Sequence, residues 1–189
     1  IEKLAADRYA VLVADAMGHG VSAALYTMLL RSLWDEHRAD LESPVRFMEV
    51  LNERLQVLVG GGGYFGTVVL ASYDAANGQL RLVRAGHPPP LLFRTNETVE
   101  AIGCRNPALG MFPNSSFQET TAQLELGDTL LLYTDGATEL FDSQDHELGK
   151  EGLLQLVRTQ VHGGGITGFH VDQLEEQLLR FSNQIHLPD

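Results

Sequence analysis

Two aspartates in this sequence each follow a short apolar run that has the composition of a buried strand. Residues 11–14 lead into Asp15 and residues 131–134 lead into Asp135, and small residues follow both aspartates. In that position a rigid strand holds the backbone while the carboxylate is exposed at the end of the sheet. Hard divalent cations take carboxylate and carbonyl oxygens as ligands. Two such aspartates brought together would suit Mg²⁺ or Mn²⁺.

A simpler interpretation is that each aspartate caps a turn or a helix. For one isolated strand followed by Asp-Gly, this cap would be favoured. Because two such aspartates follow apolar strands, a metal site and a pair of caps are about equally supported. The periodicity of the sequence does not decide between them.

Two histidines are further candidate functional groups. His19 lies in a glycine-flanked loop near Asp15, where it could be a ligand, an acid, a phosphate contact or an ordinary loop histidine with a structural hydrogen bond. His87, within Ala-Gly-His-Pro-Pro, is predicted to fix a turn. The sequence contains no His-Glu-x-x-His zinc motif, Walker phosphate loop or Gly-x-Ser-x-Gly elbow. These absences disfavour zinc-protease, P-loop and serine-hydrolase chemistry.

The elements that would position these residues follow from the hydrophobic pattern. A strand at 9–14 and a tight loop precede a helix at 21–34, which carries Leu25, Met28, Leu29 and Leu33 on one face. Ser43-Pro44 opens a second helix that runs to residue 58. Four glycines at 60–63 end it as a loop or a hinge, and we favour the loop.

The second half of the chain begins with a block of strands. Asn77-Gly78 predicts a hairpin turn. The expected strands are 66–73, 79–85, 91–94, 120–126 and 129–134. Helices are expected at 150–161 and 171–183. Helices, then antiparallel strands, then helices indicate a layered α+β fold.

Composition limits the function classes. The chain has 189 residues, 44% of them hydrophobic and 20% charged, which suits one globular domain. Thirteen basic and 25 acidic residues give a net charge of −12, which disfavours nucleic acid and anionic membranes as partners. No apolar run reaches the roughly 20 residues of a membrane-spanning helix, and the first residues do not resemble a secretion signal. The single cysteine, Cys104, excludes an intramolecular disulfide and favours a cytoplasmic location.

Several segments together resemble the SpoIIE/RsbU-type bacterial branch of the metal-dependent (type 2C) serine/threonine phosphatases. Residues 13–25 read Val-Ala-Asp-Ala-Met-Gly-His-Gly-Val-Ser-Ala-Ala-Leu and look like the family's first-helix motif. The later signatures, in the family's order, are Gly66-Thr67, Ala-Gly-His-Pro-Pro-Pro-Leu-Leu at 85–92, Gly-Asp-Thr-Leu-Leu-Leu-Tyr-Thr-Asp-Gly-Ala-Thr-Glu at 127–139, and Leu148-Gly149.

The resemblance implies an α-β-β-α sandwich of two antiparallel sheets flanked by helices, with two metal ions, Mn²⁺ or Mg²⁺, at one end. It assigns Asp15 as a bridging ligand, the carbonyl of Ala16 as a further ligand and Asp135 as a ligand from the second strand end. Asp189 stands where the family has a third metal aspartate.

The sequence departs from the family pattern at both ends. The upstream Gly-Gly-Asp-x-Tyr-Asp segment, which supplies another metal aspartate, and the final strand are absent from it. Two interpretations follow: residues 1–189 are a single phosphatase domain excerpted from a longer regulatory protein, or they are a domain with an incomplete metal site. We favour the excerpt, because a sandwich that lacks two core strands would expose long edges.

The function implied by the resemblance is hydrolysis of phosphoserine or phosphothreonine on a bacterial signalling protein of the anti-sigma-factor-antagonist type. The family's phosphatase is commonly the output domain of a response regulator. The helices between residues 21 and 58 resemble those that pair in homodimers. The main alternative is a pseudophosphatase that binds a partner without hydrolysis. A third is a metal-dependent phosphomonoesterase with a small-molecule substrate.

Overall fold

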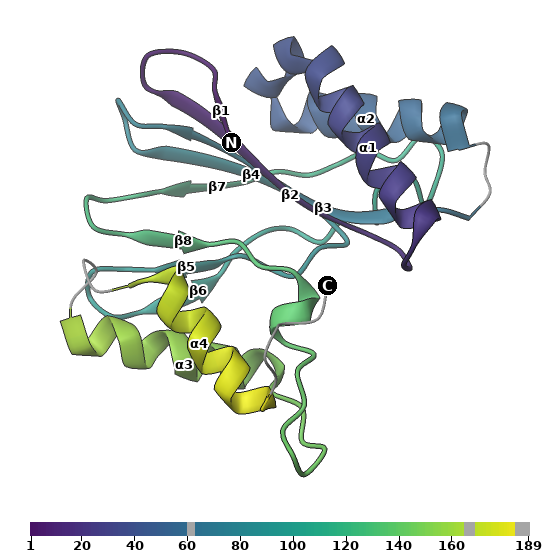
Figure 1. Ribbon diagram of the computed structural model, residues 1–189. Coiled ribbons are helices and arrows are strands. Elements are labelled where there is room, and N and C mark those ends of the chain that lie inside the picture. Colours follow the sequence, from purple (N-terminus) through teal and green to yellow (C-terminus); the bar gives the residue numbers. More distant parts are fainter. Residues whose placement is uncertain (60–62, 165–168, 184–189) are drawn as a thin grey trace. The chain divides into compact units, whose positions relative to one another are not determined.

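A computed structural model describes residues 1–59, 63–164 and 169–183 (Figure 1). In this part of the chain, two antiparallel sheets and four α-helices form the predicted α+β fold. The chain falls into two compact units: a first unit of residues 1–89 and 102–124, and a second of residues 90–101 and 125–189. The layering of the two sheets as a sandwich stays a prediction, as does the single domain. Most of the glycine segment predicted as a loop, residues 60–62, lies outside the described residues.

The first unit contains a five-stranded antiparallel sheet in the order β1-β2-β3-β4-β7. Its strands are β1 (Glu2–Lys3), β2 (Arg8–Ala16), β3 (Gly66–Asp74), β4 (Gln79–Ala85) and β7 (Thr120–Gln123). β2 pairs with β3 along its whole length, from Arg8 opposite Asp74 to Ala16 opposite Gly66. The amide of Gly78 donates to the carbonyl of Asp74 (2.8 Å), which confirms the hairpin turn.

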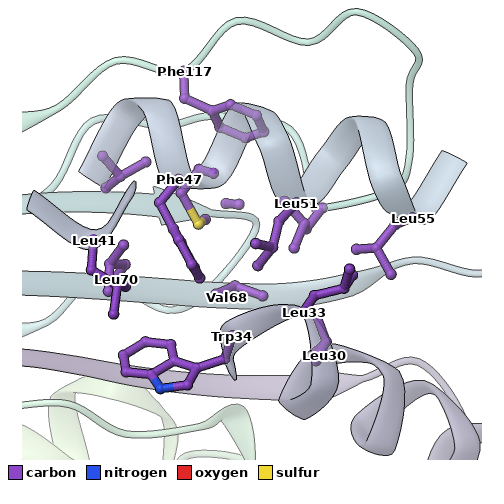
Figure 2. Close-up of a cluster of buried hydrophobic side chains, with 14 of the residues drawn as sticks. Leu30, Leu33, Trp34, Leu41, Phe47, Leu51, Leu55, Val68, Leu70 and Phe117 are labelled. Carbon is purple, nitrogen blue, oxygen red and sulfur yellow. The ribbon is translucent and has the colours of Figure 1, made fainter. Parts of the chain in front are cut away.

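Two helices cover one face of this sheet (Figure 1). They are α1 (Val21–Glu36) and α2 (Pro44–Val59), joined through a 3₁₀ helix (Arg38–Glu42). Figure 2 shows the core that they form with the strands, in which Trp34 and Phe47 meet edge to face at 5.6 Å. Other members of this core are Leu30, Leu33, Leu41, Leu51, Leu55, Val68, Leu70 and Phe117. Each such side chain contributes roughly 1.5–3 kcal/mol through burial.

The buried face of α1 differs from the predicted one. Leu33 is buried as part of it, but Leu25 and Met28 are 60% and 68% exposed. The helix is apolar on more than one side, and the sheet takes the side formed by Tyr26, Leu30, Leu33 and Trp34. Residues spaced by four, three and one positions still make one helical face. The prediction of a helix is therefore confirmed, but the prediction of which face packs against the sheet was wrong.

The second unit contains a three-stranded antiparallel sheet in the order β6-β5-β8. Its strands are β5 (Leu91–Phe93), β6 (Val99–Ala101) and β8 (Thr129–Leu131). Helices α3 (Gly149–Gly164) and α4 (Val171–Ser182) supply its core with Leu153, Val157, Leu174 and Leu178, which pack with Leu91, Phe93, Tyr133 and Leu140. β8 is shorter than the predicted 129–134, and β6 was not predicted. No described helix combines the length and the apolar character needed to cross a bilayer.

Candidate functional site

Asp15 and Ala16 are the last two residues of β2 and lie opposite Thr67 and Gly66 of β3. The amide of Gly66 donates a hydrogen bond to the carbonyl of Leu109 (3.0 Å), and its carbonyl accepts one from the amide of Leu109 (2.9 Å). Both main-chain groups of Gly66 therefore point away from β2. Pairs in an antiparallel ladder alternate between hydrogen-bonded and non-hydrogen-bonded types. The backbone of Asp15 therefore bonds to Thr67, while the carbonyl of Ala16 points to the outer side of β2.

The two faces of β2 differ in what they contact. Ala14 and Ala16 pack against the core beneath α1 and α2, as does Val68 of β3. Because side chains alternate along a strand, Asp15 and Thr67 project from the opposite face of the sheet. Both are partly exposed. The carboxylate of Asp15 and the carbonyl of Ala16 are thus two oxygen donors carried by one strand end.

Gly66 allows α1 to approach this strand end closely. A Cβ atom at residue 66 would lie 2.7 Å from Cε1 of Tyr26 and 3.0 Å from the carbonyl oxygen of Asp15. The Tyr26 hydroxyl donates to the carbonyl of Leu109 at 3.1 Å. Burial raises the pKa of Tyr26 well above its usual value, so this hydroxyl remains a donor at physiological pH. The start of β3 is therefore fixed against both α1 and residue 109.

His87 lies beside this strand end. Its Nδ1 atom is 2.9 Å from Oγ1 of Thr67, and its side chain is 1% exposed. The sequence suggested that His87 fixes a turn, but this contact with the residue opposite Asp15 was missed. Both residues belong to motifs singled out in the sequence, yet only the strand register places them together. His19 lies in the exposed loop after β2.

Asp135, in the second unit, follows β8 and begins a short 3₁₀ turn (Asp135–Ala137). Its main-chain carbonyl accepts hydrogen bonds from the amides of Thr138 and Glu139 (2.7 and 2.9 Å) and from the Thr138 hydroxyl (2.9 Å). Within the described residues, none donates to its carboxylate, which is partly exposed. The turn is thus closed by the carbonyl, and the carboxylate is available to a ligand.

The donor chemistry fits a hard cation. Asp15 and Asp135 offer carboxylates and Ala16 offers a carbonyl, the oxygen types that Mg²⁺ and Mn²⁺ take. Asp189 lies outside the described residues. Across residues 1–59, 63–164 and 169–183, no three His, Cys, Asp or Glu side chains gather to hold a metal ion. The assignments of Asp15, Ala16, Asp135 and Asp189 as ligands stay predictions.

Comparison with known proteins gives a family match over nearly the whole chain. Residues 5–186 match the family described as Stage II sporulation protein E (SpoIIE). Phosphoserine phosphatase RsbP of Bacillus subtilis is 33% identical over 135 residues, which cover 70% of this chain and 34% of RsbP. Phosphoserine phosphatase RsbU of the same organism is 25% identical over 130 residues, 68% of this chain and 38% of RsbU. The chain thus spans about a third of the length of these curated relatives.

Solved structures show the same fold. The RsbU and RsbW domains of Rv1364c from Mycobacterium tuberculosis match with a TM-score of 0.77 and 27% identity, over 95% of this chain and 49% of that one. The SiaA-PP2C domain of Pseudomonas aeruginosa matches with a TM-score of 0.81 and 20% identity, over 98% of this chain and 74% of that one. A structure of RsbX in complex with magnesium matches with a TM-score of 0.66 and 17% identity, over 95% and 77% of the two chains.

Proposed function

Because the chain belongs to the SpoIIE family and is a PP2C-type phosphatase domain related to RsbU, RsbP and SpoIIE, we propose that it is a metal-dependent protein serine/threonine phosphatase. The observation that carries the proposal is the placement of Asp15 and Ala16 at the end of β2, where the pairing with β3 continues to the last residue. Both residues lie within the segment that matches the family. That end presents two hard oxygen donors on a rigid backbone. We further propose that the two units act together as one phosphatase domain.

The proposed cofactors are two Mn²⁺ or Mg²⁺ ions, with Asp15, the carbonyl of Ala16, Asp135 and Asp189 as the ligands that this chain contributes. Bound cations of this kind lower the pKa of a coordinated water and neutralise phosphoryl oxygens. The chain's own residues would supply the negative charge that holds such ions, and the ladder between β2 and β3 fixes the backbone that carries the Asp15 carboxylate. The aspartates do not attack phosphorus, so no phosphoenzyme forms.

The proposed substrate is a phosphorylated signalling protein of the anti-sigma-factor-antagonist type. The support is the similarity to RsbP and RsbU, which are both named phosphoserine phosphatases. We also propose that the domain is the cytoplasmic output of a longer regulatory protein and that it forms a homodimer.

The test is Mn²⁺-dependent hydrolysis of a generic phosphate ester by the full-length protein and by its Asp15→Asn and Asp135→Asn variants. Mutating even the outer partners of a metal ligand costs about 10- to 100-fold in metal affinity or activity, so loss of a ligand should cost more than about 100-fold. Asp145→Asn is the matched control, because Asp145 is exposed in a loop with a positive φ of 61° that asparagine tolerates.

The outcomes separate the proposed function from its alternatives. Metal-dependent turnover that both site variants lose, and the control keeps, supports the phosphatase. Wild-type turnover in either site variant contradicts the assignment. A folded full-length protein with no turnover under any divalent cation favours the partner-binding pseudophosphatase. A panel of phosphopeptides and phosphorylated metabolites then distinguishes a protein substrate from a small molecule.

A further inference from the structure

Thr67 is the cross-strand neighbour of the proposed metal ligand Asp15. The two residues face each other in the β2–β3 ladder, and their side chains lie on the same face of the sheet. Side chains of directly opposed residues have Cβ atoms about 4.5–5.5 Å apart, which is close enough to interact. The hydroxyl of Thr67 is therefore the nearest cross-strand polar group that the ladder offers to the Asp15 carboxylate.

The regular pairing of β3 with β4 ends before Thr67, and this irregularity brings His87 into contact with Thr67. β3 and β4 pair regularly only as far as Val69 opposite Arg84, and beyond that point Gly86 bridges to Val68 in the parallel sense. Gly86 has a φ of 67°, and a Cβ atom there would lie 2.9 Å from Cβ of Ala108. Only glycine fits this bend comfortably.

The backbone around His87 is held by side chains and by main-chain contacts. Arg84 donates from Nη1 to the carbonyl of His87 at 2.7 Å. The amide of Gly86 donates to the carbonyl of Asn106 at 3.1 Å, and Asn106 donates from Nδ2 to the carbonyl of Arg84 at 3.0 Å. A buried imidazole on such a fixed backbone points its Nδ1 atom at Thr67 with little freedom to move.

We propose that Thr67 and His87 are positioning residues that orient the Asp15 carboxylate for metal binding; this inference rests on the proposed function. His87 in the tautomer with its proton on Nδ1 donates to Oγ1 of Thr67. The hydroxyl of Thr67 then donates its own proton toward Asp15, since a hydroxyl has one donor and two acceptor sites. A carboxylate oriented in this way keeps its other lone pairs for the cation, as hydrogen-bonded ligating carboxylates do.

The first test replaces Thr67 with valine, which has the same shape and removes only the hydroxyl. Thr67→Ser is the matched control that keeps the hydroxyl. Mn²⁺ binding is measured on the full-length protein without substrate, by the signal of free Mn²⁺ in electron paramagnetic resonance. Thr67→Val should weaken binding by about 10- to 100-fold, while Thr67→Ser stays within a few-fold of wild type. With phosphate ester, kcat at fixed Mn²⁺ should fall and KM for the ester should change little.

The second test addresses His87. Asparagine can place its amide donor near the position of Nδ1, whereas leucine cannot donate, so His87→Asn should retain most of the Mn²⁺ affinity that His87→Leu loses. Because His87→Leu alters a buried site, its thermal unfolding is measured beside its binding. Nitrogen-15 spectra of the wild-type protein report the tautomer directly, and we expect the His87 proton on Nδ1.

The failure of this inference is distinguishable from the failure of the proposed function. Wild-type Mn²⁺ affinity in Thr67→Val, or a His87 proton found on Nε2, overturns the positioning roles even if Asp15→Asn abolishes turnover. Weakened Mn²⁺ binding in Thr67→Val together with no phosphatase turnover in the wild type supports the positioning roles and removes the enzyme. A wild-type protein that binds no Mn²⁺ overturns both.

Discussion

The ends of β2 and β8 carry the same sequence pattern, an apolar run followed by an aspartate and small residues, but they fold differently. β2 has nine residues and is paired with β3 through Asp15 to its last residue. β8 has three residues, after which the chain leaves the sheet and enters a 3₁₀ turn at Asp135. One aspartate therefore belongs to a continuous ladder and the other belongs to a turn.

The partner strand accounts for this difference. β3 has nine residues and pairs with β2 to its last residue, whereas β5, the partner of β8, has three residues and begins at Leu91, opposite Leu131, the last residue of β8. An apolar run can be paired only as far as its neighbour extends, because unpaired main-chain groups need other partners. Apolar length in a sequence thus reports burial and does not by itself report strand length.

The largest expected effect comes from lengthening each aspartate by one methylene. Asp15→Glu should reduce Mn²⁺-dependent turnover by more than about 100-fold, because the ladder cannot shift to accommodate the longer side chain. Asp135→Glu should cost less, about 10-fold, because a three-residue turn can adjust. Steady-state turnover at saturating Mn²⁺ checks both variants. Equal losses would show that the two strand ends hold their carboxylates with equal rigidity.

The second prediction concerns the hydrogen bonds to the carboxylate of Asp128, which hold the start of β8, a strand with only a short ladder. The carboxylate of Asp128 accepts hydrogen bonds from Arg94 Nη1 (2.9 Å), the amide of Thr95 (3.2 Å) and the amide of Glu125 (3.0 Å). Hydrogen bonds to charged groups contribute about 1.5–3 kcal/mol each, so Asp128→Ala should destabilise the second unit by about 3 kcal/mol. Site-resolved amide exchange in β5 and β8, compared with β2 and β3, measures this loss.

Glu100 provides the control for that measurement, because it also pairs with Arg94 but is 52% exposed. Exposed ion pairs contribute at most about 1 kcal/mol, so Glu100→Ala should have a small effect. A comparable loss of stability in Asp128→Ala and Glu100→Ala would mean that the hydrogen bonds donated to Asp128 by the amides of Thr95 and Glu125 contribute nothing.

The third prediction concerns the packing at the end of β2. Gly66→Ala would press a methyl group against the ring of Tyr26, which the hydrogen bond to Leu109 holds in place. Such overpacking typically costs about 2 kcal/mol. Gly152→Ala in α3 is the contrasting variant, since the three atoms nearest to its methyl all belong to the side chain of Leu148, which can change rotamer. Because alanine favours helix by up to about 1 kcal/mol over glycine, Gly152→Ala should be neutral or stabilising in a urea titration.

Much of the fold was accessible from the sequence. The strand at 9–14, the Asn-Gly hairpin and the helix from Pro44 were confirmed within a few residues, because each depends on local pattern and turn chemistry. The exposed stripe on α1 and the short β8 were not, because both depend on which neighbour a segment packs against. A helix that is apolar on two sides, like α1 with Leu25 and Leu30, does not reveal from its sequence which side the sheet will cover.

The candidate site shows the same division. Asp15 and Ala16 could be proposed from a strand end and a motif, and they do end a strand. The contact between Thr67 and His87 spans 20 residues and exists only because the regular register stops at Arg84. No local signal in the sequence marks where a ladder breaks, although the glycine before His87 is consistent with a bend.

The fourth prediction uses pH to compare the two units. Burial alone would raise the pKa of Asp128, but the hydrogen bonds from Glu125, Arg94 and Thr95 outweigh it and lower the pKa below its usual value. When the pKa of a carboxyl is lower in the folded state than in the unfolded state, the group stabilises the fold at pH values above its unfolded-state pKa of about 4. This stabilisation is lost as the pH falls from that value through the folded-state pKa. Amide protection in β5 and β8 should therefore fall before that in β2 and β3 during acidification.

Asp128→Asn tests the cause of this effect, since it removes the titrating group while it keeps one acceptor oxygen. The partly exposed carboxyl of Asp142, whose pKa the amides of His146 and Gln144 also lower, titrates in the same direction and remains in the variant. If acidification still weakens β5 and β8 in Asp128→Asn as strongly as in wild type, Asp142 or another group is responsible.

The smallest expected effect comes from Thr138, whose hydroxyl donates to the main-chain carbonyl of Asp135 at 2.9 Å. That carbonyl also accepts from two amides, so Thr138→Val should cost only about 0.5–1 kcal/mol of stability, and Thr138→Ser should cost less. The change acts on the backbone of Asp135 and leaves its carboxylate untouched. Mn²⁺ affinity should therefore fall only a few-fold, well below the loss in Thr67→Val. An equal loss would mean that the turn at Asp135 depends on one hydroxyl as strongly as Asp15 does, and the contrast between a ladder-held and a turn-held aspartate would then fail.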